Sequence, residues 1–528
     1  MSQLVTTYKC ADGTDFPVAW EDESDAELTW SLNGSHWSAP LKPLDIAAWE
    51  VSLPARERAF SEAGLPLPDY FRKVSLPNGF VYMSPPTLTE DGVDDLVRRC
   101  GGIAPVWVEY CRPLVEEACA KLQSAGDDTP VAELIDTCFY GFMMTQVAAA
   151  VILSSTRRLS GFLVEAFGPE AEALTGELTQ GYTNSTMDAS QALWEIAQAA
   201  SRSPEVRELM LGSDLSTALD ALAHVEGGAR FRSAFEGFLQ RYGWRSEGWE
   251  AASPTWTEQP AIPLGMVRRM IIDETPSPAG ALDDVVRRRR ELADELESRL
   301  QPDSAKQAEF RDLLALASSY VSVREDRAHW QLTAFGSLRA AVLRRGEKIV
   351  RAGSIDKPED IFYLLPEEIE TQDEAVQSTL RSVVEERRSD WERWAGVELP
   401  NQIGLVDDAA AAAVPASTSE DEREIRGVAA SQGVATGPAK VVSDIADGDR
   451  LRPGDILVCK TTSPPWTVLF GRAAAVVTDT GGALAHTAIT AREYAIPCVV
   501  GARGATDRIH DGMLITVNGT EGVVLLTV

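Results

Sequence analysis

Several familiar sequence signatures are missing from this chain of 528 residues. Its seven cysteines are dispersed and include no Cys-x-x-Cys pair, so we expect neither a disulfide framework nor a zinc site. No Gly-x-x-x-x-Gly-Lys-Ser/Thr loop is present, which argues against a P-loop nucleotide site. The N-terminus also lacks the basic start and apolar core of a signal peptide, and we therefore expect a cytoplasmic protein.

Positive charge is scarce as well. The chain has 49 Lys and Arg residues against 80 Asp and Glu residues, which gives a formal net charge of -31. Such a surface repels nucleic acid and anionic membranes, so neither is an expected partner. The 44% of hydrophobic and 24% of charged residues are typical of a soluble globular protein. The length corresponds to about three domains of ordinary size.

One long run without charge, residues 137–156, raises the question of a membrane span. Its length alone would permit one. However, the run contains Tyr140, Thr145 and Gln146 together with many alanines, and it is much less apolar than a typical spanning helix. We therefore predict a buried central helix. Its Phe and Met side chains either pack a core or line an apolar pocket.

The residues that point to chemistry lie in one stretch near the C-terminus. Residues 473–477 predict a buried strand, the Gly481-Gly482 pair a tight turn, and residues 487–494 a short helix. His486 stands at the start of that helix, where unpaired N–H groups and partial positive charge favour an attached anion such as a phosphoryl group. The alternative is a packed histidine in an ordinary loop.

The same stretch resembles the swivelling phosphohistidine domain of the phosphoenolpyruvate synthase, pyruvate phosphate dikinase and rifampicin phosphotransferase group. The motif of that family is Gly-Gly, three residues, His, then Ala-Arg-Glu and Ile-Pro-Val-Val-Gly. The matching positions here are Gly481, Gly482, His486, Ala491, Arg492, Glu493, Ile496, Pro497, Val499, Val500 and Gly501, with Cys498 intervening. The resemblance implies that His486 accepts and donates a phosphoryl group.

The resemblance also suggests which residues would bind the phosphate. We expect it to lie against Gly481, Gly482 and Thr487. Arg492, further along the same helix, is another candidate contact, although it can instead pair with Glu493 or with a neighbouring domain.

Weaker matches to the substrate domain of rifampicin phosphotransferase-like proteins spread over much of residues 30–370. They comprise residues 33–44, 181–187, 238–245, 320–327 and 358–364. These segments and the C-terminal phosphohistidine domain contain five candidate substrate contacts: His36, Arg245, Arg324, Glu325 and Trp466. Alternatives stay open, because His36 can simply pack beside Trp37, and Arg324 with Glu325 can form a structural ion pair. In the second match, Thr186 or Asp188 is available to cap a helix.

The chain departs from the family pattern at several positions. Trp249 stands where the family has a Glu four residues after its Arg, and Thr255 replaces a usual Arg. Before Trp466, the usual Thr-Asp-Pro is Thr-Ser-Pro here, so Ser463 replaces a carboxylate near the transfer site. We expect altered polar contacts at the first two positions, and an effect on substrate choice or metal placement at the third.

The predicted architecture is multidomain. Residues 1–405 form a substrate-binding-like domain, β- and loop-rich over residues 1–85 and mainly α-helical over residues 86–405. Residues 406–425 are small, polar and low in complexity, which predicts a flexible linker. Residues 426–528 form the α/β swivelling phosphohistidine domain, whose histidine must visit a donor site and an acceptor site in turn.

The ATP-grasp nucleotide domain that precedes the substrate domain in full-length relatives has no counterpart in this sequence. The resemblance therefore implies a separate ATP-grasp partner that binds ATP and Mg²⁺ and phosphorylates His486, similar to split members such as phenylphosphate synthase. We expect no metal site in this chain.

The expected function is that of a phosphotransferase component. It would move the phosphoryl group from His486 to a hydroxyl of a small, fairly apolar molecule bound among the helices of residues 87–350. Activation of that hydroxyl for later elimination is a further option that the sequence leaves open. One alternative is a phosphocarrier or regulatory module whose helices bind a protein. Another is a binding protein whose histidine is no longer phosphorylated. The sequence identifies neither the acceptor nor the general base.

Overall fold

The computed structural model divides the chain into two compact units. It describes residues 4–526 except 11, 21, 35, 38, 73, 85–89, 101, 103–105, 183, 213, 275–276, 301–303, 398, 406–422, 464–465 and 483–484. Unit 1 comprises Met1–Val151, Gly248–Ser253 and Trp330–Val414, and unit 2 comprises Ile152–Glu247, Pro254–His329 and Pro415–Val528. Most of the predicted linker, residues 406–425, lies outside the described residues.

Unit 1 begins with two small sheets. Strands β1 (Val5–Lys9) and β2 (Asp15–Ala19) form an antiparallel pair. The other sheet has the order β4-β5-β3-β6, formed by Val74–Ser75, Tyr82–Met83, Thr29–Leu32 and Gln402–Gly404. Trp30 pairs with Ile403 across it, and both side chains are buried. The end of the helical region therefore returns to complete the N-terminal core.

The prediction that residues 1–85 are rich in strands and loops is only partly right. Two helices, α1 (Pro43–Val51) and α2 (Leu53–Glu62), follow the strands, and each has a proline at its first or second position. Proline suits the first turn of a helix because its missing N–H needs no partner there. In the sequence, these prolines look equally typical of loops.

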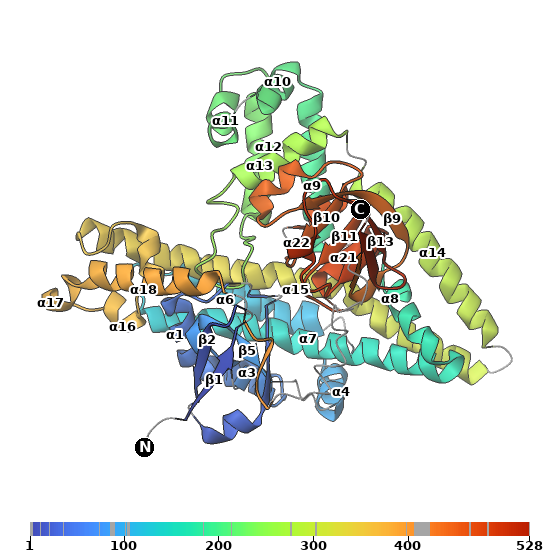
Figure 1. Cartoon of the computed structure of the whole chain (residues 1–528), viewed down its shortest axis with the longest axis horizontal. Helices are drawn as coiled ribbons and strands as arrows, with labels where there is room; N and C mark the ends of the chain where they lie inside the picture. The colour runs from blue at the N-terminus through green and yellow to red at the C-terminus, as the bar shows by residue number, and fades with distance from the viewer. Residues whose placement is uncertain are drawn as a thin grey trace. The chain divides into compact units, whose positions relative to one another are not determined.

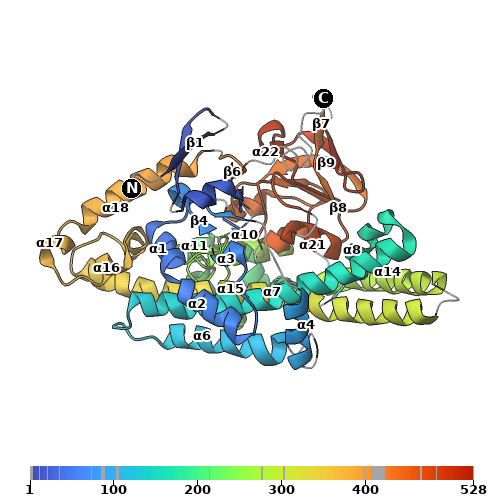
Figure 2. The same ribbon diagram turned by 90° about the horizontal axis from the view of Figure 1, so that it is seen from below.

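Two long helices, α7 (Val131–Phe167) and α15 (Ser304–Arg351), each contribute residues to both units (Figure 1). In unit 1 they lie side by side, as Figure 2 also shows: Gln331 on α15 donates to the Thr145 hydroxyl on α7 at 2.8 Å. The Phe335 ring lies 5.2 Å from that of Phe142.

Helix α7 contains the uncharged run considered above as a membrane span. By length and composition it is the one helix among the described residues that would pass as a span, yet 69% of its most apolar window is buried. Met143, Met144 and Val147 are each 0% exposed. This burial agrees with the predicted core helix.

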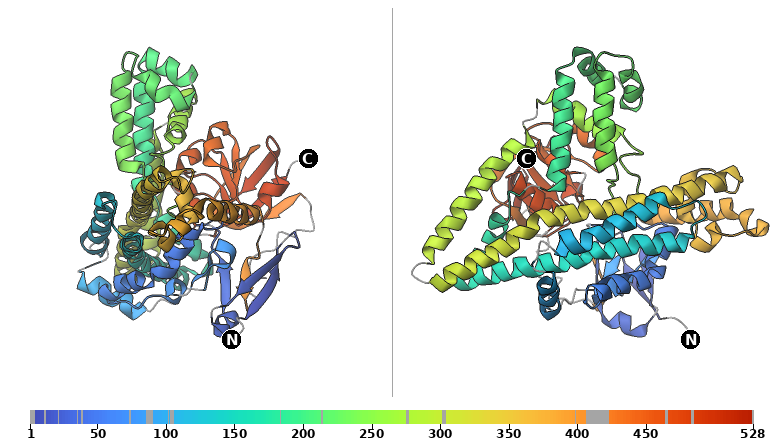
Figure 3. Two further views of the ribbon diagram at one scale, coloured as in Figure 1. Left: turned by 90° about the vertical axis from the view of Figure 1, so that its left-hand side faces the viewer. Right: turned by 180° about the vertical axis from the view of Figure 1, so that it is seen from behind.

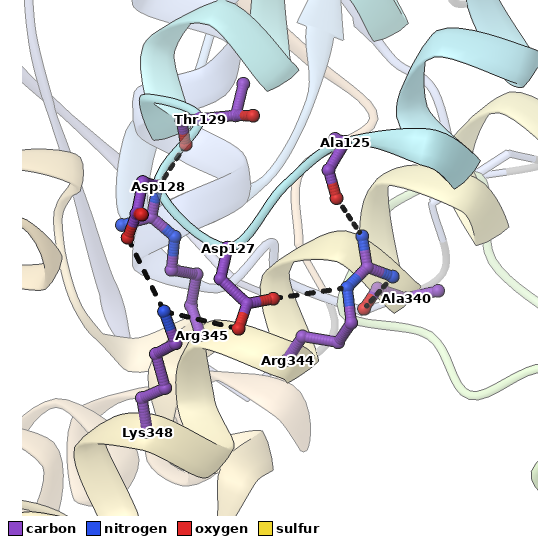
Figure 4. Close-up of polar contacts among 8 residues, drawn as sticks. All are labelled: Ala125, Asp127, Asp128, Thr129, Ala340, Arg344, Arg345 and Lys348. Atoms are coloured by element: carbon purple, nitrogen blue, oxygen red, sulfur yellow. Dashed lines mark hydrogen bonds and ion pairs between the residues drawn. The ribbon is translucent and has the colours of Figure 1, made fainter.

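The connection between α6 (Arg112–Ser124) and α7 is fastened to α15 by charged side chains (Figure 4). Lys348 pairs with Asp127 at 3.2 Å, and Arg344 donates to the carbonyl oxygen of Ala125 at 3.0 Å. Arg345 donates to the carbonyl of Thr129. These contacts hold one end of α15 against the loop. The remaining helices of unit 1 are α3 (Asp69–Arg72), α4 (Glu90–Arg99), α16 (Pro366–Ile369), α17 (Glu374–Gln377) and α18 (Leu380–Ala395).

Unit 2 combines a helical part with an α/β part. Besides parts of α7 and α15, the helical part contains α8 (Leu174–Leu178), α9 (Ser185–Ser201), α10 (Pro204–Gly212), α11 (Leu215–Leu222), α12 (Gly228–Tyr242), α13 (Ala261–Ile272) and α14 (Pro278–Arg299). Helices α9, α12 and α13, in green, lie beside one another (Figure 3). The cap of α9 is Asn184, whose side-chain oxygen accepts from the N–H groups of Thr186 and Met187. The expectation that Thr186 or Asp188 caps this helix is therefore wrong.

The α/β part is built on an eight-stranded sheet of order β7-β14-β13-β9-β10-β11-β12-β8. Its centre is parallel, from β9 through β10 and β11 to β12, and its flanks are antiparallel. The central strands β10 and β11 are buried throughout, as parallel strands covered on both faces should be. The strands are β7 (Glu424–Arg426), β8 (Val428–Ser431), β9 (Val434–Val441), β10 (Ile456–Cys459), β11 (Ala475–Thr478), β12 (Cys498–Val500), β13 (Leu514–Asn518) and β14 (Val523–Leu526).

One apolar core joins the two parts of unit 2. It contains Met266 and Met270 of α13 together with Leu469 and Phe470 of α20 (Thr467–Phe470). The α/β part is therefore docked on the helices of its own unit.

Candidate functional site

His486 is the first residue of α21 (His486–Glu493), at the end of the sheet where β11 finishes. Gly481 has φ +110°, a backbone angle that residues with a side chain rarely adopt, and it allows the turn between strand and helix. The preceding residue, Ala485, caps α21 without a side-chain hydrogen bond. The predicted strand, turn and helix are thus confirmed, with the histidine at the end of the helix that favours anions.

The Nε2 atom of His486 lies between two hydroxyl groups. Thr467 Oγ1, on α20, is 3.2 Å away, and Thr490 Oγ1, one turn further along α21, is 3.3 Å away. A hydroxyl group can donate to an unprotonated ring nitrogen and can rotate to meet a different acceptor. The sequence prediction missed both threonines, although the spacing of His486 and Thr490 on one helix face could have indicated the second.

A second hydroxyl pair lies beneath the first residues of α21. Thr487 Oγ1 is 2.7 Å from Thr462 Oγ1, and both residues are buried. The hydroxyl of Thr487, an expected phosphate contact, is thus engaged with Thr462. Ser463, which stands where the family has a carboxylate, is 7% exposed, and its Oγ has no hydrogen-bond partner within the described part of the chain.

Asp479, which precedes the glycine turn, is fixed by hydrogen bonds from Thr506. Its carboxylate accepts from the N–H of Thr506 at 3.0 Å and from the hydroxyl of the same residue. Burial raises the pKa of Asp479, and these hydrogen bonds oppose that shift. Gly482 has open space where a Cβ would be, so this glycine, an expected phosphate contact, is accessible.

The guanidinium group of Arg492, an expected phosphate contact, lies in unit 2. Arg492 is half-buried and packs against Gly176 of α8. Its Nε lies 3.3 Å from the point that a Cβ atom on this glycine would occupy. Burial lowers the pKa of Arg492, and the charge of Arg324 lowers it further. The side chain of Glu325 lies outside the described residues.

The other expected substrate contacts are placed elsewhere. Arg245 is 2% exposed, and its Nη2 donates to the carbonyl of Ser185 at the start of α9, 3.0 Å away. Trp466 is 5% exposed and packs in the apolar core of unit 2. His36 belongs to unit 1, where its Nδ1 is 2.8 Å from Asn33 Oδ1 and its ring lies beside Trp249.

Unit 1 contains a charge cluster that the sequence did not reveal. The Asp45 carboxylate accepts from the N–H of Ala251 at 3.0 Å, and Arg339 donates to the carbonyls of Ala251 and Ala252 at 3.2 and 2.9 Å. Burial raises the pKa of Asp45 to about 6. Burial also raises the pKa of Glu250 to about 7, with repulsion from Asp45 adding to the shift. The cluster holds residues 248–253 in unit 1.

No group of three or more His, Cys, Asp or Glu side chains that could hold a metal occurs among the residues that the structure describes. All seven cysteines are free thiols, and six of them are buried. The groups shown to contact Nε2 of His486 are the hydroxyls of Thr467 and Thr490, which can donate to an anion.

Comparison with known families agrees with this geometry. Residues 140–325 match the rifampicin phosphotransferase fourth domain, and residues 451–522 match the mobile domain of PEP-utilising enzymes. The second match contains His486, Gly481 and both threonines at Nε2.

Individual relatives extend the likeness over most of the chain. A rifampicin phosphotransferase from Streptomyces sp is 35% identical over 65% of this chain and 40% of its own length. The uncharacterized phosphotransferase YvkC of Bacillus subtilis is 30% identical over 70% of this chain and 45% of its own length. Chondramide synthase cmdD of Chondromyces crocatus is 27% identical over 97% of this chain, but this covers only 14% of the synthase. The chain thus spans less than half the length of these relatives.

The sheet, the glycine turn and a histidine at a helix start define a mobile domain of the phosphohistidine type, joined to a helical domain. Together with the family match, they make residues 451–522 a mobile domain of the PEP-utilising type. Its helical domain and its mobile domain are similar to those of the rifampicin phosphotransferase-like group of PEP-utilising enzymes.

Proposed function

We propose that this chain relays a phosphoryl group through His486 to a hydroxyl group of a small organic molecule. The observation that carries the proposal is the position of His486 Nε2 at the start of α21, between the hydroxyls of Thr467 and Thr490. A hydroxyl that donates to Nε2 leaves the proton of the ring on Nδ1. Nε2 then carries the lone pair that attacks phosphorus.

In the first step, Nε2 forms a bond to phosphorus while the bond between phosphorus and the oxygen of the leaving group breaks. The hydroxyls of Thr467 and Thr490 can then rotate from the ring nitrogen to the phosphoryl oxygens. The N–H groups at the start of α21 face the same negative charge. Catalysis of this kind rests on positioning and charge neutralisation, and the hydroxyls and the helix end supply both.

In the second step, an acceptor hydroxyl attacks phosphorus, the bond to Nε2 breaks, and the hydroxyl proton passes to a base. Arg324 and Arg492 are the cations that would neutralise the oxygens of the transferred group. Arg492 lies on α21, the helix that begins with His486, and this position supports the role of its guanidinium. Phosphorylation would turn the hydroxyl into a better leaving group for a later elimination.

The donor side would lie outside the residues present here. We propose that an ATP-grasp nucleotide domain, on a separate partner protein, binds ATP and Mg²⁺ and phosphorylates His486. Mg²⁺ bound there would neutralise charge on the nucleotide phosphates. We place the whole reaction in the cytoplasm.

The acceptor would be a small, fairly apolar molecule with a free hydroxyl, bound among the helices of residues 87–350. Two observations support this class of acceptor. Residues 140–325 match a domain of rifampicin phosphotransferase, and the relative that aligns with 97% of the chain is a chondramide synthase. Both names refer to small organic products or substrates. His36 in unit 1 and Arg324 in unit 2 both stay candidate acceptor contacts in this proposal.

The test is a transfer assay with the full chain, an ATP-grasp domain from a rifampicin phosphotransferase, labelled ATP and a panel of hydroxylated natural products. The expected result is label on His486 that then moves to one class of small molecule. Label that reaches His486 and no small molecule would favour a phosphocarrier that acts on a protein. If wild type takes up no more label than the His486→Ala variant, the chain is a binding protein and the proposal is wrong.

A further inference from the structure

A buried ion network connects the two parts of unit 2. Asp273, which directly follows α13, is paired with Arg269 through a 2.9 Å contact between Nη2 and Oδ1 and a 3.0 Å contact between Nε and Oδ2. It also pairs with Arg472, between α20 and β11, through a 3.0 Å contact from Nε to Oδ2. The side chains of Asp273 and Arg472 are 5% and 4% exposed. Both charges are therefore removed from water.

Arg472 depends on this carboxylate. Its Nη1 reaches the carbonyl oxygen of Gly448 only at 3.4 Å, and its Nη2 is buried with no hydrogen-bond partner among the described residues. Burial lowers the pKa of Arg472 to about 10, and Asp273 is the largest opposing influence. A buried ion pair adds little net stability, but removal of one partner leaves an uncompensated charge at high cost. Such a pair thus favours one docked arrangement over others.

The surroundings of the network are shared by both parts of unit 2. Helix α13 lies against the 3-10 helix η6 (Ile445–Arg450), whose first N–H donates to Glu247 Oε1 at 3.0 Å. The apolar core that contains Leu469 and Phe470 seals the same side. Undocking would therefore expose an apolar surface and separate Arg472 from Asp273, which would keep Arg269 as its partner.

The network is also close in the chain to the His486 site. Arg472 comes two residues after α20, the helix that carries Thr467, whose hydroxyl contacts Nε2 of His486. Displacement of Arg472 relative to α13 would thus move the segment that positions the histidine.

We propose that Asp273, with Arg269 and Arg472, is a docking lock that fixes the His486-bearing α/β part on α13. The lock would set the fraction of molecules in which the α/β part is docked on α13. In the remaining fraction, His486 would be free to meet a phosphoryl donor. The functional half of this proposal rests on the phosphoryl relay proposed above. Asp273 is a positioning residue, because it touches neither His486 nor a transferred group.

The test measures the docked arrangement directly in the full chain. Spin labels are attached through cysteines introduced at Ser233 on α12 and Val434 on β9, both of which are exposed. In wild type we expect one narrow distribution of label distances. In Asp273→Asn the docked fraction should fall by a factor of about ten or more, with a broad distribution of longer distances.

A matched control is available within the α/β part. Asp511 also binds two cations, Lys440 at 2.9 Å and Arg450, but all three residues lie in the α/β part. Asp511→Asn should leave the distance distribution unchanged. The double variant Asp273→Leu/Arg472→Met replaces the two most buried charges by apolar groups and leaves Arg269, whose side chain is 18% exposed and can reach water. This variant should restore the narrow distribution. If Asp273→Asn does not fold, Arg472→Lys tests the same contact, since Lys cannot reproduce the planar guanidinium.

An unchanged distribution in Asp273→Asn, or equal broadening in Asp511→Asn, would overturn the proposal. So would a double variant that stays as broad as the single variant. These distances need no phosphorylation, so they test the lock even if the phosphoryl relay fails. If the relay is correct, phosphorylation of His486 by phosphoramidate should change by less than about twofold in Asp273→Asn, whereas delivery to the acceptor should fall about as far as the docked fraction.

Discussion

The His486 site and the charge cluster around Asp45 are built in opposite ways. The contacts of His486 come from a short part of the chain, residues 462–490, where a strand, a glycine turn and a helix follow one another. Asp45 and Arg339 meet at residues 251–252, to which both form hydrogen bonds although all three segments are far apart in the sequence. One site is a local motif, and the other exists only after the chain has folded.

The difference suggests a division of labour. A chemical group that must move between partners benefits from contacts that travel with it, and Thr467 and Thr490 belong to the same α/β part as His486. A cluster that stabilises a fixed fold can draw its members from distant segments. We therefore expect substitutions near His486 to affect phosphorylation first, and substitutions in unit 1 to affect stability first.

The largest effect on stability should come from the core of α7. Met144 is 0% exposed, and Met144→Ala should lower the free energy of unfolding by about 2–5 kcal/mol because it leaves a cavity. Urea unfolding in detergent-free buffer measures this. Val108→Ala, at a position 52% exposed, is the control and should change stability by less than about 0.5 kcal/mol. Equal effects would show that α7 is not a core helix.

Asp45 should make the stability of the fold depend on pH. Its folded pKa of about 6 exceeds the ordinary value of 3.8, so the folded protein binds this proton more tightly than the unfolded chain. The stabilising contribution is therefore complete below about pH 4 and is lost as the pH rises to about 6, a change of about 3 kcal/mol. Asp45→Asn should remove it.

The measurement is urea unfolding of wild type and Asp45→Asn between pH 4 and pH 7, compared as a difference at each pH. Asparagine keeps the oxygen that accepts from Ala251. A constant difference across this range would mean that Asp45 titrates at an ordinary pKa and that the cluster is hydrated.

In the His486 site, a substitution in the glycine turn should have a smaller effect on stability than the changes in unit 1. Gly481 has φ +110°, so Gly481→Ala strains the turn by about 1–3 kcal/mol. We expect a lower melting temperature and slower phosphorylation of His486. Gly482→Ala is a close control, because Gly482 has no positive φ and open space at its Cβ position. If both variants behave alike, the backbone angle of Gly481 is not what positions the helix.

The smallest expected effect concerns the hydroxyls at Nε2. Thr490→Val keeps the shape of the side chain but removes one contact worth about 1 kcal/mol, so the rate of phosphorylation should fall by less than about tenfold. Thr436→Val removes a similar hydroxyl contact, 2.8 Å to Thr516, on the exposed side of the sheet and should leave the rate unchanged. Rapid-quench assays of both variants decide the matter. An unaffected Thr490→Val would leave Nε2 without the proposed stabilisation.

The C-terminal elements could be predicted because their signals are local. The expected strand over residues 473–477 is β11 (Ala475–Thr478), and the expected helix over residues 487–494 is α21 (His486–Glu493). Glycine, proline and apolar runs determine these elements within a few residues.

The remaining features depend on partners that are distant in the chain. The spacing of Arg269 and Asp273 is visible on one helix, but their pairing with Arg472 appears only when α13 meets the α/β part. Asn184 was overlooked as a cap because Thr186 and Asp188 are equally plausible cap residues by type. The burial of Arg245 and Trp466 likewise could not follow from residue type, since either side chain can bind a substrate or fill a core.

The proposed relay depends on phosphorylation of His486 at Nε2. The most direct measurement is ³¹P NMR of the full chain after reaction with phosphoramidate, combined with peptide mass spectrometry. We expect a single acid-labile, base-stable phosphohistidine at residue 486, with phosphorus on Nε2, and no such signal in His486→Gln. A phosphorylated Nδ1, or a signal that persists in His486→Gln, would contradict it.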